Sequence, residues 1–319
     1  MDKIVLSKRE LKCLHKINNS GSEAVISVYQ PSQTKKSIEH GELLKGCVIK
    51  SFSRNTVIND FLTADEYQQY IENKHQKTMA YSMMDSSNFK IFNIPLGPIY
   101  LNKDFFGFYQ AHLKNATSLQ SKCYNTHSLD YLNLEAFTNY ISQINDGLIF
   151  ELHPNNIYTD DFHLSNILVD KDNQIHFIDA DGFRVGDINE TYYYLSHYIK
   201  DDDLYYAHLK NNPKYLKNGI LRANRDRDIY YTYAHFIELI TKKQIDHISK
   251  ANLYQLLERA NFPNEFIDDF SKCLRSDCEN TFIQQDTLDK IRTDYKMCLV
   301  PFSKGNYNVE PDCRLVKKR

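Results

Sequence analysis

The sequence predicts an α+β protein with a small β-rich N-terminal lobe and a larger helical C-terminal lobe. Short apolar runs with β-type alternation, separated by turn residues, dominate the first 112 positions. From about residue 113, apolar residues instead recur at the three- and four-residue spacing of amphipathic helices. The chain has 319 residues, which is longer than most single hydrophobic cores. We therefore expect two lobes, residues 1–112 and 113–319.

The N-terminal lobe contains the predicted strands and one predicted helix. Strands are expected at 24–29, 46–50, 94–101 and 105–109, where apolar residues alternate between turn residues. A helix is expected around 63–76. It begins with a capping-box pattern, because Thr63 and Glu66 are spaced so that each side chain can accept the other's backbone N–H.

The C-terminal lobe contains predicted helices and one predicted hairpin. Helical spacing of apolar residues covers 137–144, 228–240 and 252–260. Two β-branched runs, 166–170 and 174–178, flank a Lys-Asp-Asn turn, which is typical of a β-hairpin.

Composition excludes several classes of protein. The chain is 42% hydrophobic and 25% charged with a formal net charge of −2, so it predicts a soluble globular protein that does not bind nucleic acid. No apolar stretch approaches the ~18 residues of a membrane span, and we expect a cytoplasmic location with no membrane partner. The seven cysteines are odd in number and include no CxxC pair, which favours reduced thiols over disulfides or a zinc site.

Three polar residues near the predicted hairpin are spaced for phosphate chemistry. Asn166 follows Asp161 by five positions, and Asp179 follows Asn166 by thirteen. The hairpin lies between Asn166 and Asp179 and is expected to bring them close together. Carboxylate and amide oxygens are hard ligands of the kind that Mg²⁺ prefers. The segment therefore predicts a site for metal-bound phosphate.

Residues 14–283 resemble the protein-kinase fold, and in particular the divergent eukaryotic-like kinases of bacteria. The run from Asp161 to Asn166 is similar to the catalytic loop D-x-x-x-x-N, and Asp179-Ala-Asp181 takes the place of the D-F-G triplet. Other parts follow in the order of that fold: a degenerate glycine-rich loop at 17–25, a strand ending at Lys50, a strand entering the hinge at 106–113, a helix start at 224–228 whose Asp228 braces the catalytic loop, and late helices at 262–274.

The resemblance implies an ATP- and Mg²⁺-dependent serine/threonine protein kinase, with a bilobal kinase-like fold. Asp161 would orient the acceptor hydroxyl and accept its proton, Lys50 would bind the α- and β-phosphates, and Asn166 and Asp179 would bind the metal. Other implied nucleotide-site residues are Gly21, Ser22 and Val25 of the glycine-rich loop, His112 and Leu113 of the hinge, and Glu66 as the ion-pair partner of Lys50.

Several assignments stay open at this level. Glu72 competes with Glu66 as the partner of Lys50, and we prefer Glu66 because it shares a helical face with Tyr70. His163 either packs within its loop or indicates a small-molecule kinase, since D-x-H-x-x-N occurs in aminoglycoside kinases. Asp181 either adds a third carboxylate to the metal site or fills a turn position usually held by glycine.

The sequence also departs from the kinase pattern. Thr159 and Asp160 stand where histidine and arginine usually precede the catalytic aspartate, Ala180 and Asp181 replace the phenylalanine and glycine of the triplet, and no A-P-E follows. Lacking that arginine, an active enzyme would not need activation-loop phosphorylation. The altered triplet and the eroded glycine-rich loop keep a pseudokinase open as an alternative, and His163 keeps a small-molecule kinase open. A protein substrate is expected, whereas the acceptor, the pathway and the oligomeric state are not predicted.

Overall fold

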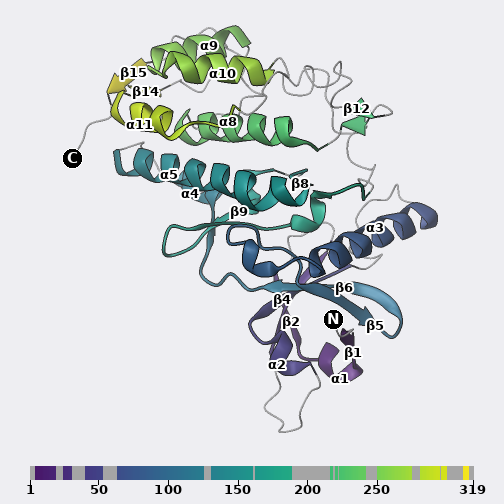
Figure 1. Cartoon of the computed structure of the whole chain (residues 1–319). Coiled ribbons are helices and arrows are strands. Elements are labelled where there is room, and N and C mark those ends of the chain that lie inside the picture. The colour runs from purple at the N-terminus through teal and green to yellow at the C-terminus, as the bar shows by residue number, and fades with distance from the viewer. Residues whose placement is uncertain are drawn as a thin grey trace. The chain divides into compact units, whose positions relative to one another are not determined.

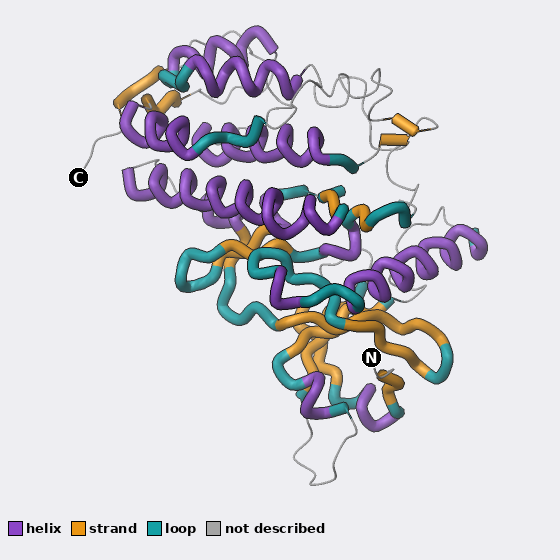
Figure 2. The backbone as a smooth tube through the Cα atoms, in the orientation of Figure 1, coloured by secondary structure: helices purple, strands orange, loops and turns teal. Residues whose placement is uncertain are grey.

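The computed structural model has an α+β architecture, with a six-stranded mixed sheet in its N-terminal part and a mostly helical C-terminal part (Figures 1 and 2). It describes residues 4–18, 24–30, 40–52, 63–125, 131–160, 162–188, 216–217, 220–221, 223–241, 250–274, 281–294, 296–299 and 312–315. The chain forms two compact units. Unit 1 comprises residues 1–115 and 178–191, and unit 2 comprises residues 116–177 and 192–319.

The sheet of unit 1 has the strand order β1-β5-β6-β4-β3-β2. Its strands are β1 (Ile4–Leu6), β2 (Leu14–Asn18), β3 (Val25–Tyr29), β4 (Cys47–Ser51), β5 (Gly97–Leu101) and β6 (Asp104–Ala111). β1 pairs with β5 in parallel, and every other pair is antiparallel. Short helices α1 (Lys8–Leu11) and α2 (Gly41–Leu44) and the strand β11 (Arg184–Val185) complete this unit with the long helix α3 (Ala64–Ser82).

Strand β4 is an interior strand of the sheet and carries Lys50 (Figure 1). Its residues alternate between faces, so that Ile49 joins an apolar cluster with Tyr109 on one face while Phe108, the cross-strand partner of Lys50, joins another cluster with Phe52 and Tyr70. Gly107 faces Ser51 across the ladder, and a Cβ there would lie 2.1 Å from the Lys50 carbonyl oxygen. The close approach requires glycine at this position.

Helix α3 packs against β5 and β6, as Figure 1 shows. The predicted capping box is present: the Glu66 carboxylate accepts the Thr63 backbone N–H at 2.6 Å, and the Thr63 hydroxyl accepts that of Glu66 at 3.3 Å. The helix is longer than its predicted span of 63–76. Its buried face is mostly polar, and comprises Tyr70, Asn73, Lys74, Lys77, Thr78 and Tyr81.

Unit 2 is built on helices that pack in pairs. Its helices are α4 (Leu119–Asn125), α5 (Tyr131–Gly147), α8 (Arg225–Thr241), α9 (Lys250–Arg259), α10 (Asn264–Leu274) and α11 (Gln285–Asp294). α5 lies against α8 and α11, and α10 lies against α8 (Figure 1). The core between them is aromatic: Tyr233 and Phe236 of α8 contact Phe266 of α10.

Short strands complete unit 2. They are β7 (Thr117–Ser118), β8 (Ile157–Tyr158), β9 (Ile167–Val169), β10 (Ile175–Phe177), β12 (Leu216–Lys217), β13 (Ile220–Leu221), β14 (Lys296–Leu299) and β15 (Asp312–Leu315). β9 and β10 pair in antiparallel fashion, so the predicted hairpin is confirmed. The four strands expected in the N-terminal part are also present, as β3, β4, β5 and β6. Within the described ranges, no helix combines the length and apolarity that a membrane crossing requires.

Candidate functional site

Lys50 lies at the centre of a buried ion-pair cluster in unit 1. Its Nζ donates to Asp181 Oδ1 at 2.7 Å and to Asp179 Oδ1 at 3.1 Å. Strand β4 supplies the lysine, and the segment after β10 supplies both aspartates, so residues about 130 positions apart meet within one unit. The predicted lysine and metal-site aspartate are thus in direct contact.

The second oxygen of Asp181 is bound by another lysine. Lys74 of α3 donates to Asp181 Oδ2 at 2.7 Å and to the Asp181 backbone carbonyl at 3.2 Å. The Lys74 ammonium also lies 5.2 Å from the centre of the Tyr70 ring and 5.9 Å from that of Phe52, within the range of cation–π attraction. We refer to Lys50, Lys74, Asp179 and Asp181 as the Lys50 cluster.

The electrostatics of the cluster favour charged side chains despite their burial. Burial disfavours the ionised form of Asp181, but Lys50 and Lys74 outweigh it and hold the pKa of this carboxyl well below its usual range. Burial likewise opposes the charge of Lys50, yet Asp181 and Asp179 raise its pKa above the ordinary lysine value. Asp181 is therefore a carboxylate and Lys50 an ammonium at neutral pH.

The turn after Asp179 is fixed by backbone hydrogen bonds and by α3. Asp179 has a left-handed backbone, with φ of 62°, a conformation that aspartate tolerates better than most residues. The Gly182 N–H donates to the Asp179 carbonyl at 2.9 Å, and the Tyr81 hydroxyl donates to the Ala180 carbonyl at 2.9 Å. Lys77 donates to the Gly182 carbonyl at 3.4 Å. Both ends of the turn are therefore held, while the Asp179 side chain keeps 36% of its surface exposed.

In unit 2, helix α8 holds the chain on both sides of position 161. Asp228 Oδ1 accepts the Thr159 backbone N–H at 3.1 Å and the Thr159 hydroxyl. Arg227 donates to the Asp160 carboxylate at 2.7 Å and to its carbonyl at 3.1 Å. His235 Nε2 bonds to the Phe162 carbonyl. Residues 159, 160 and 162 are thus anchored by a single helix.

Asp228 is fully buried, and its hydrogen bonds offset only part of the effect of burial on its pKa. Its side chain has no exposed surface, and its Oδ2 lies 2.9 Å from His153 Nε2. Burial raises the pKa of Asp228, and hydrogen bonds from His153 and Thr159 act in the opposite direction. His153 Nδ1 is buried and has no hydrogen-bond partner among the described residues, so Nε2 is the ring nitrogen that contacts Asp228.

The other predicted site residues fall into three groups. Glu66 caps α3 and is not among the ion-pair partners of Lys50 in the described structure, while Glu72 is exposed and accepts from Gln76. Val25 begins β3, and His112 and Leu113 follow β6, where the His112 N–H donates to the Gly46 carbonyl at 3.1 Å. Gly21, Ser22 and Asp161 lie outside the described residues.

The two predicted metal ligands belong to different units. Asn166 ends a 3-10 turn of unit 2 and donates its backbone N–H to the carbonyl of His163, whose side chain is exposed. Asp179 belongs to unit 1. Among the residues that the structure describes, no group of three or more histidine, cysteine, aspartate or glutamate side chains is arranged to hold a metal.

Sequence reasoning missed three residues that organise these sites. Lys74, Arg227 and His235 each contact the segments around the predicted motifs. The sequence did indicate Lys74, because it stands four positions after Tyr70 and seven before Tyr81 and so shares their face of a helix. The ammonium of a lysine on a buried helix face either reaches solvent at the end of its long side chain or is paired in the interior.

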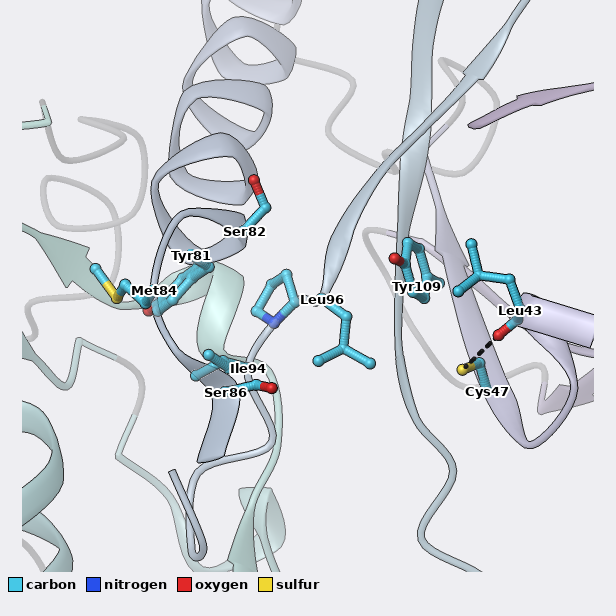
Figure 3. Close-up of a pocket in the computed structure, with 10 residues that line it drawn as sticks. Leu43, Cys47, Tyr81, Ser82, Met84, Ser86, Ile94, Leu96 and Tyr109 are labelled. Atoms are coloured by element: carbon cyan, nitrogen blue, oxygen red, sulfur yellow. Dashed lines mark hydrogen bonds between the residues drawn. The ribbon is translucent and has the colours of Figure 1, made fainter. Parts of the chain in front are cut away.

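Unit 1 also contains a cavity of about 260 Å³ (Figure 3). Figure 3 shows Tyr81 and Ser82 of α3 on one side and Tyr109, Leu43 and Cys47 on the other. The remaining lining residues are Met84, Ser86, Ile94, Pro95 and Leu96. Burial raises the pKa of Cys47, so its thiol stays neutral at pH 7 and is a weak nucleophile.

Comparison with known proteins gives no family for this chain. It matches no protein-family model, and a search of curated proteins finds no significant relative. Its function must therefore be inferred from the residues of the two units.

Proposed function

We propose that the protein is an ATP- and Mg²⁺-dependent phosphotransferase of the kinase type that acts on serine or threonine hydroxyls of a protein. The observation that carries the proposal is the contact between Lys50 and Asp179. A buried strand lysine beside a partly exposed aspartate supplies a cation for phosphate and a carboxylate for metal, the two charges that phosphoryl transfer requires.

The architecture of unit 1 supports this proposal. β3 and β4 precede α3, and β5 and β6 follow it, as in the small lobe expected from the kinase resemblance. Lys50 lies on the strand before the helix, and His112 and Leu113 follow the last strand, where the hinge is expected. The sheet thus supports the assigned order of parts, although the glycine-rich loop residues Gly21 and Ser22 fall outside the described ranges.

The chemistry of Asp179 suits magnesium. Its carboxylate is partly exposed on a turn held at both ends, and Mg²⁺ is usually bound by one or two carboxylates together with substrate phosphates. Asp179 would hold the ion, which when bound neutralises charge on the phosphates. Lys50 would then bind phosphate oxygens, since its raised pKa keeps it protonated at neutral pH.

The anchoring of the segment around position 161 supports a role for Asp161. Three α8 side chains fix the chain immediately before and after this residue. A base that accepts the acceptor's proton must stay within hydrogen-bond reach of it, so a rigid backbone on both sides favours that task. We assign Asp161 as the residue that orients the acceptor hydroxyl and accepts its proton.

Label transfer from ATP tests the proposal. The purified protein is incubated with Mg²⁺ and γ-labelled ATP, with and without generic protein acceptors, and phosphate incorporation is located by mass spectrometry. We expect incorporation on serine or threonine that falls at least about 100-fold in Asp161→Asn, the usual scale of a lost general base. Asp104→Asn, a change of the same chemistry at an exposed position of β6, should retain it.

Each other result has a defined meaning. Transfer that persists in Asp161→Asn and in Lys50→Met would remove the assignment of these residues. Turnover of ATP only with hydroxylated small molecules would replace the protein acceptor by a metabolite, the alternative that His163 suggests. Stabilisation by Mg·ATP without turnover of any acceptor would indicate a nucleotide-binding pseudokinase.

A further inference from the structure

Lys74 stands out among the charged residues that the proposed mechanism does not use. It occupies the middle of α3, and only 4% of its side chain is exposed. Its ammonium contacts the Asp181 carboxylate, the Asp181 carbonyl, and the rings of Tyr70 and Phe52. A lysine is rarely buried so completely without a partner that compensates its charge.

The Lys50 cluster is a linear chain of alternating charges. Asp181 bridges the two lysines, with Oδ2 on Lys74 and Oδ1 on Lys50, and Lys50 continues to Asp179. Side-chain exposure is 4% for Lys74, 1% for Asp181, 10% for Lys50 and 36% for Asp179. The row of charges is therefore buried at Lys74 and accessible to solvent at Asp179.

We infer that Lys74 is a positioning residue that compensates the charge of Asp181 and so leaves the charge of Lys50 available to an anionic ligand. Without Lys74, Lys50 would be the only cation among the described residues within hydrogen-bond distance of the Asp181 carboxylate. Separating an ammonium from a buried carboxylate that it neutralises costs free energy, because the carboxylate is left unpaired in the interior. With Lys74 present, Asp181 fixes the direction of Lys50 Nζ without cancelling its charge.

This inference rests on the proposed function for the identity of the ligand, which is the polyphosphate of a nucleotide bound with Mg²⁺. Lys74 does not touch the ligand in this scheme, because its ammonium is enclosed by α3, Phe52 and Asp181. Asp181 likewise acts through Lys50. Asp181, which stands where the kinase pattern has a glycine, is thus paired with Lys74 of α3. The kinase resemblance instead implies a glutamate on this helix, paired with Lys50.

The test is a double-variant cycle read by the dissociation constant for Mg·ATP. Lys74→Met should weaken nucleotide binding about tenfold. A tenfold change in an equilibrium constant is at the low end of the effects that a full charge at this distance has on the ionisation of a neighbouring group. Adding Asp181→Asn should restore affinity to within about twofold of the wild type, because it removes the uncompensated carboxylate. The matched control is Lys90→Met, at an exposed position of unit 1, which should bind like the wild type. A purely structural role predicts the opposite order, with the double variant weakest.

Two further measurements keep the result decisive. Lys74→Gln retains a hydrogen-bond donor without the charge, and it replaces Lys74→Met if that variant fails to fold; it should show the same loss and rescue. Acylation of lysines by an amine-reactive ester, located by mass spectrometry, needs no nucleotide: Lys50 should react about tenfold faster in Asp181→Asn, whereas Lys90 should not change.

The outcomes separate the two proposals. Absence of Mg·ATP binding in the wild type would overturn the proposed function, and the acylation rates would still decide the arrangement of the cluster. Normal binding in the wild type with unchanged affinity in Lys74→Met would overturn the role of Lys74 alone. Equal acylation of Lys50 in the wild type and Asp181→Asn would show that Asp181 does not hold Lys50.

Discussion

The charge balance of the Lys50 cluster predicts a strong departure from additivity in stability. Asp181→Asn leaves two ammonium groups with one carboxylate, and Lys74→Met leaves two carboxylates with one ammonium. The double variant leaves Lys50 with Asp179, which is balanced. Each single change therefore creates an unpaired buried charge, whereas the double change does not.

The magnitudes follow from what is left unpaired. Removing one partner of a buried ion pair typically destabilises a protein by about 3–5 kcal/mol, because the remaining charge stays desolvated. Independent effects would give about 6–10 kcal/mol for the double variant, comparable to the whole stability of a typical domain. We expect the double variant to be no less stable than the worse single variant. The coupling free energy is then about 3–5 kcal/mol, far above the ~0.5 kcal/mol scatter of independent sites.

Urea unfolding measures this cycle. The chain has no tryptophan, so far-UV circular dichroism or the fluorescence of its 23 tyrosines is the appropriate signal. Hydrogen exchange of peptides from α3 reports unit 1 separately from unit 2. Two results would refute the argument that charge balance holds this cluster together. One is a loss of less than about 1 kcal/mol of unfolding free energy in the single variants, and the other is a loss in the double variant that equals the sum of the single losses.

Three other perturbations give distinct expectations. Asp228→Ala should destabilise unit 2 by about 3 kcal/mol or more in urea, because it leaves the Thr159 N–H and His153 without their acceptor; Asp228→Asn, which keeps an acceptor, should cost less than half as much. Gly107→Ala should lower the urea midpoint strongly, since its Cβ would meet the backbone of β4 at 2.1 Å, whereas Gly46→Ala, with nothing within 4 Å and φ of 81°, should cost about 1–2 kcal/mol. Because the pKa of Asp181 is lowered in the fold, its contribution to stability is present above the ordinary value of 3.8 and is lost as pH falls below it. The stability gap between wild type and Asp181→Asn should therefore be full at pH 7 and narrow at pH 3, in urea titrations at each pH.

Local patterns predicted the elements that depend on local physics. Alternation located β3, β4, β5 and β6, and the capping box placed the start of α3 within one residue. The Lys-Asp-Asn turn predicted the β9–β10 hairpin correctly. These features arise from side-chain periodicity and short-range hydrogen bonds, which a single sequence contains in full.

The ion pairs of the site could not be predicted in the same way. The pairing of Lys74 with Asp181 spans 107 positions, and nothing in the spacing of either residue specifies the other. The expectation that Glu66 pairs with Lys50 came from the kinase resemblance and from its position near Tyr70. In the structure, the carboxylate of Glu66 accepts the N–H that begins α3, at 2.6 Å. The capping pattern in the sequence already indicated that competing role.

Lys74 and Asp181 are best understood as one pair of compensating charges. Without Lys74, Asp181 and Asp179 would share Lys50 as the one ammonium of the cluster, and without Asp181, Lys74 would lose the carboxylate that it contacts at 2.7 Å. Each is unfavourable without the other, since uncompensated charge in the interior costs several kcal/mol. It follows that chains of this kind should carry both residues or neither. An aspartate two positions after the proposed metal-binding aspartate then predicts a lysine on the buried face of the preceding long helix. A chain with only one of the pair would contradict the compensation argued for Lys50.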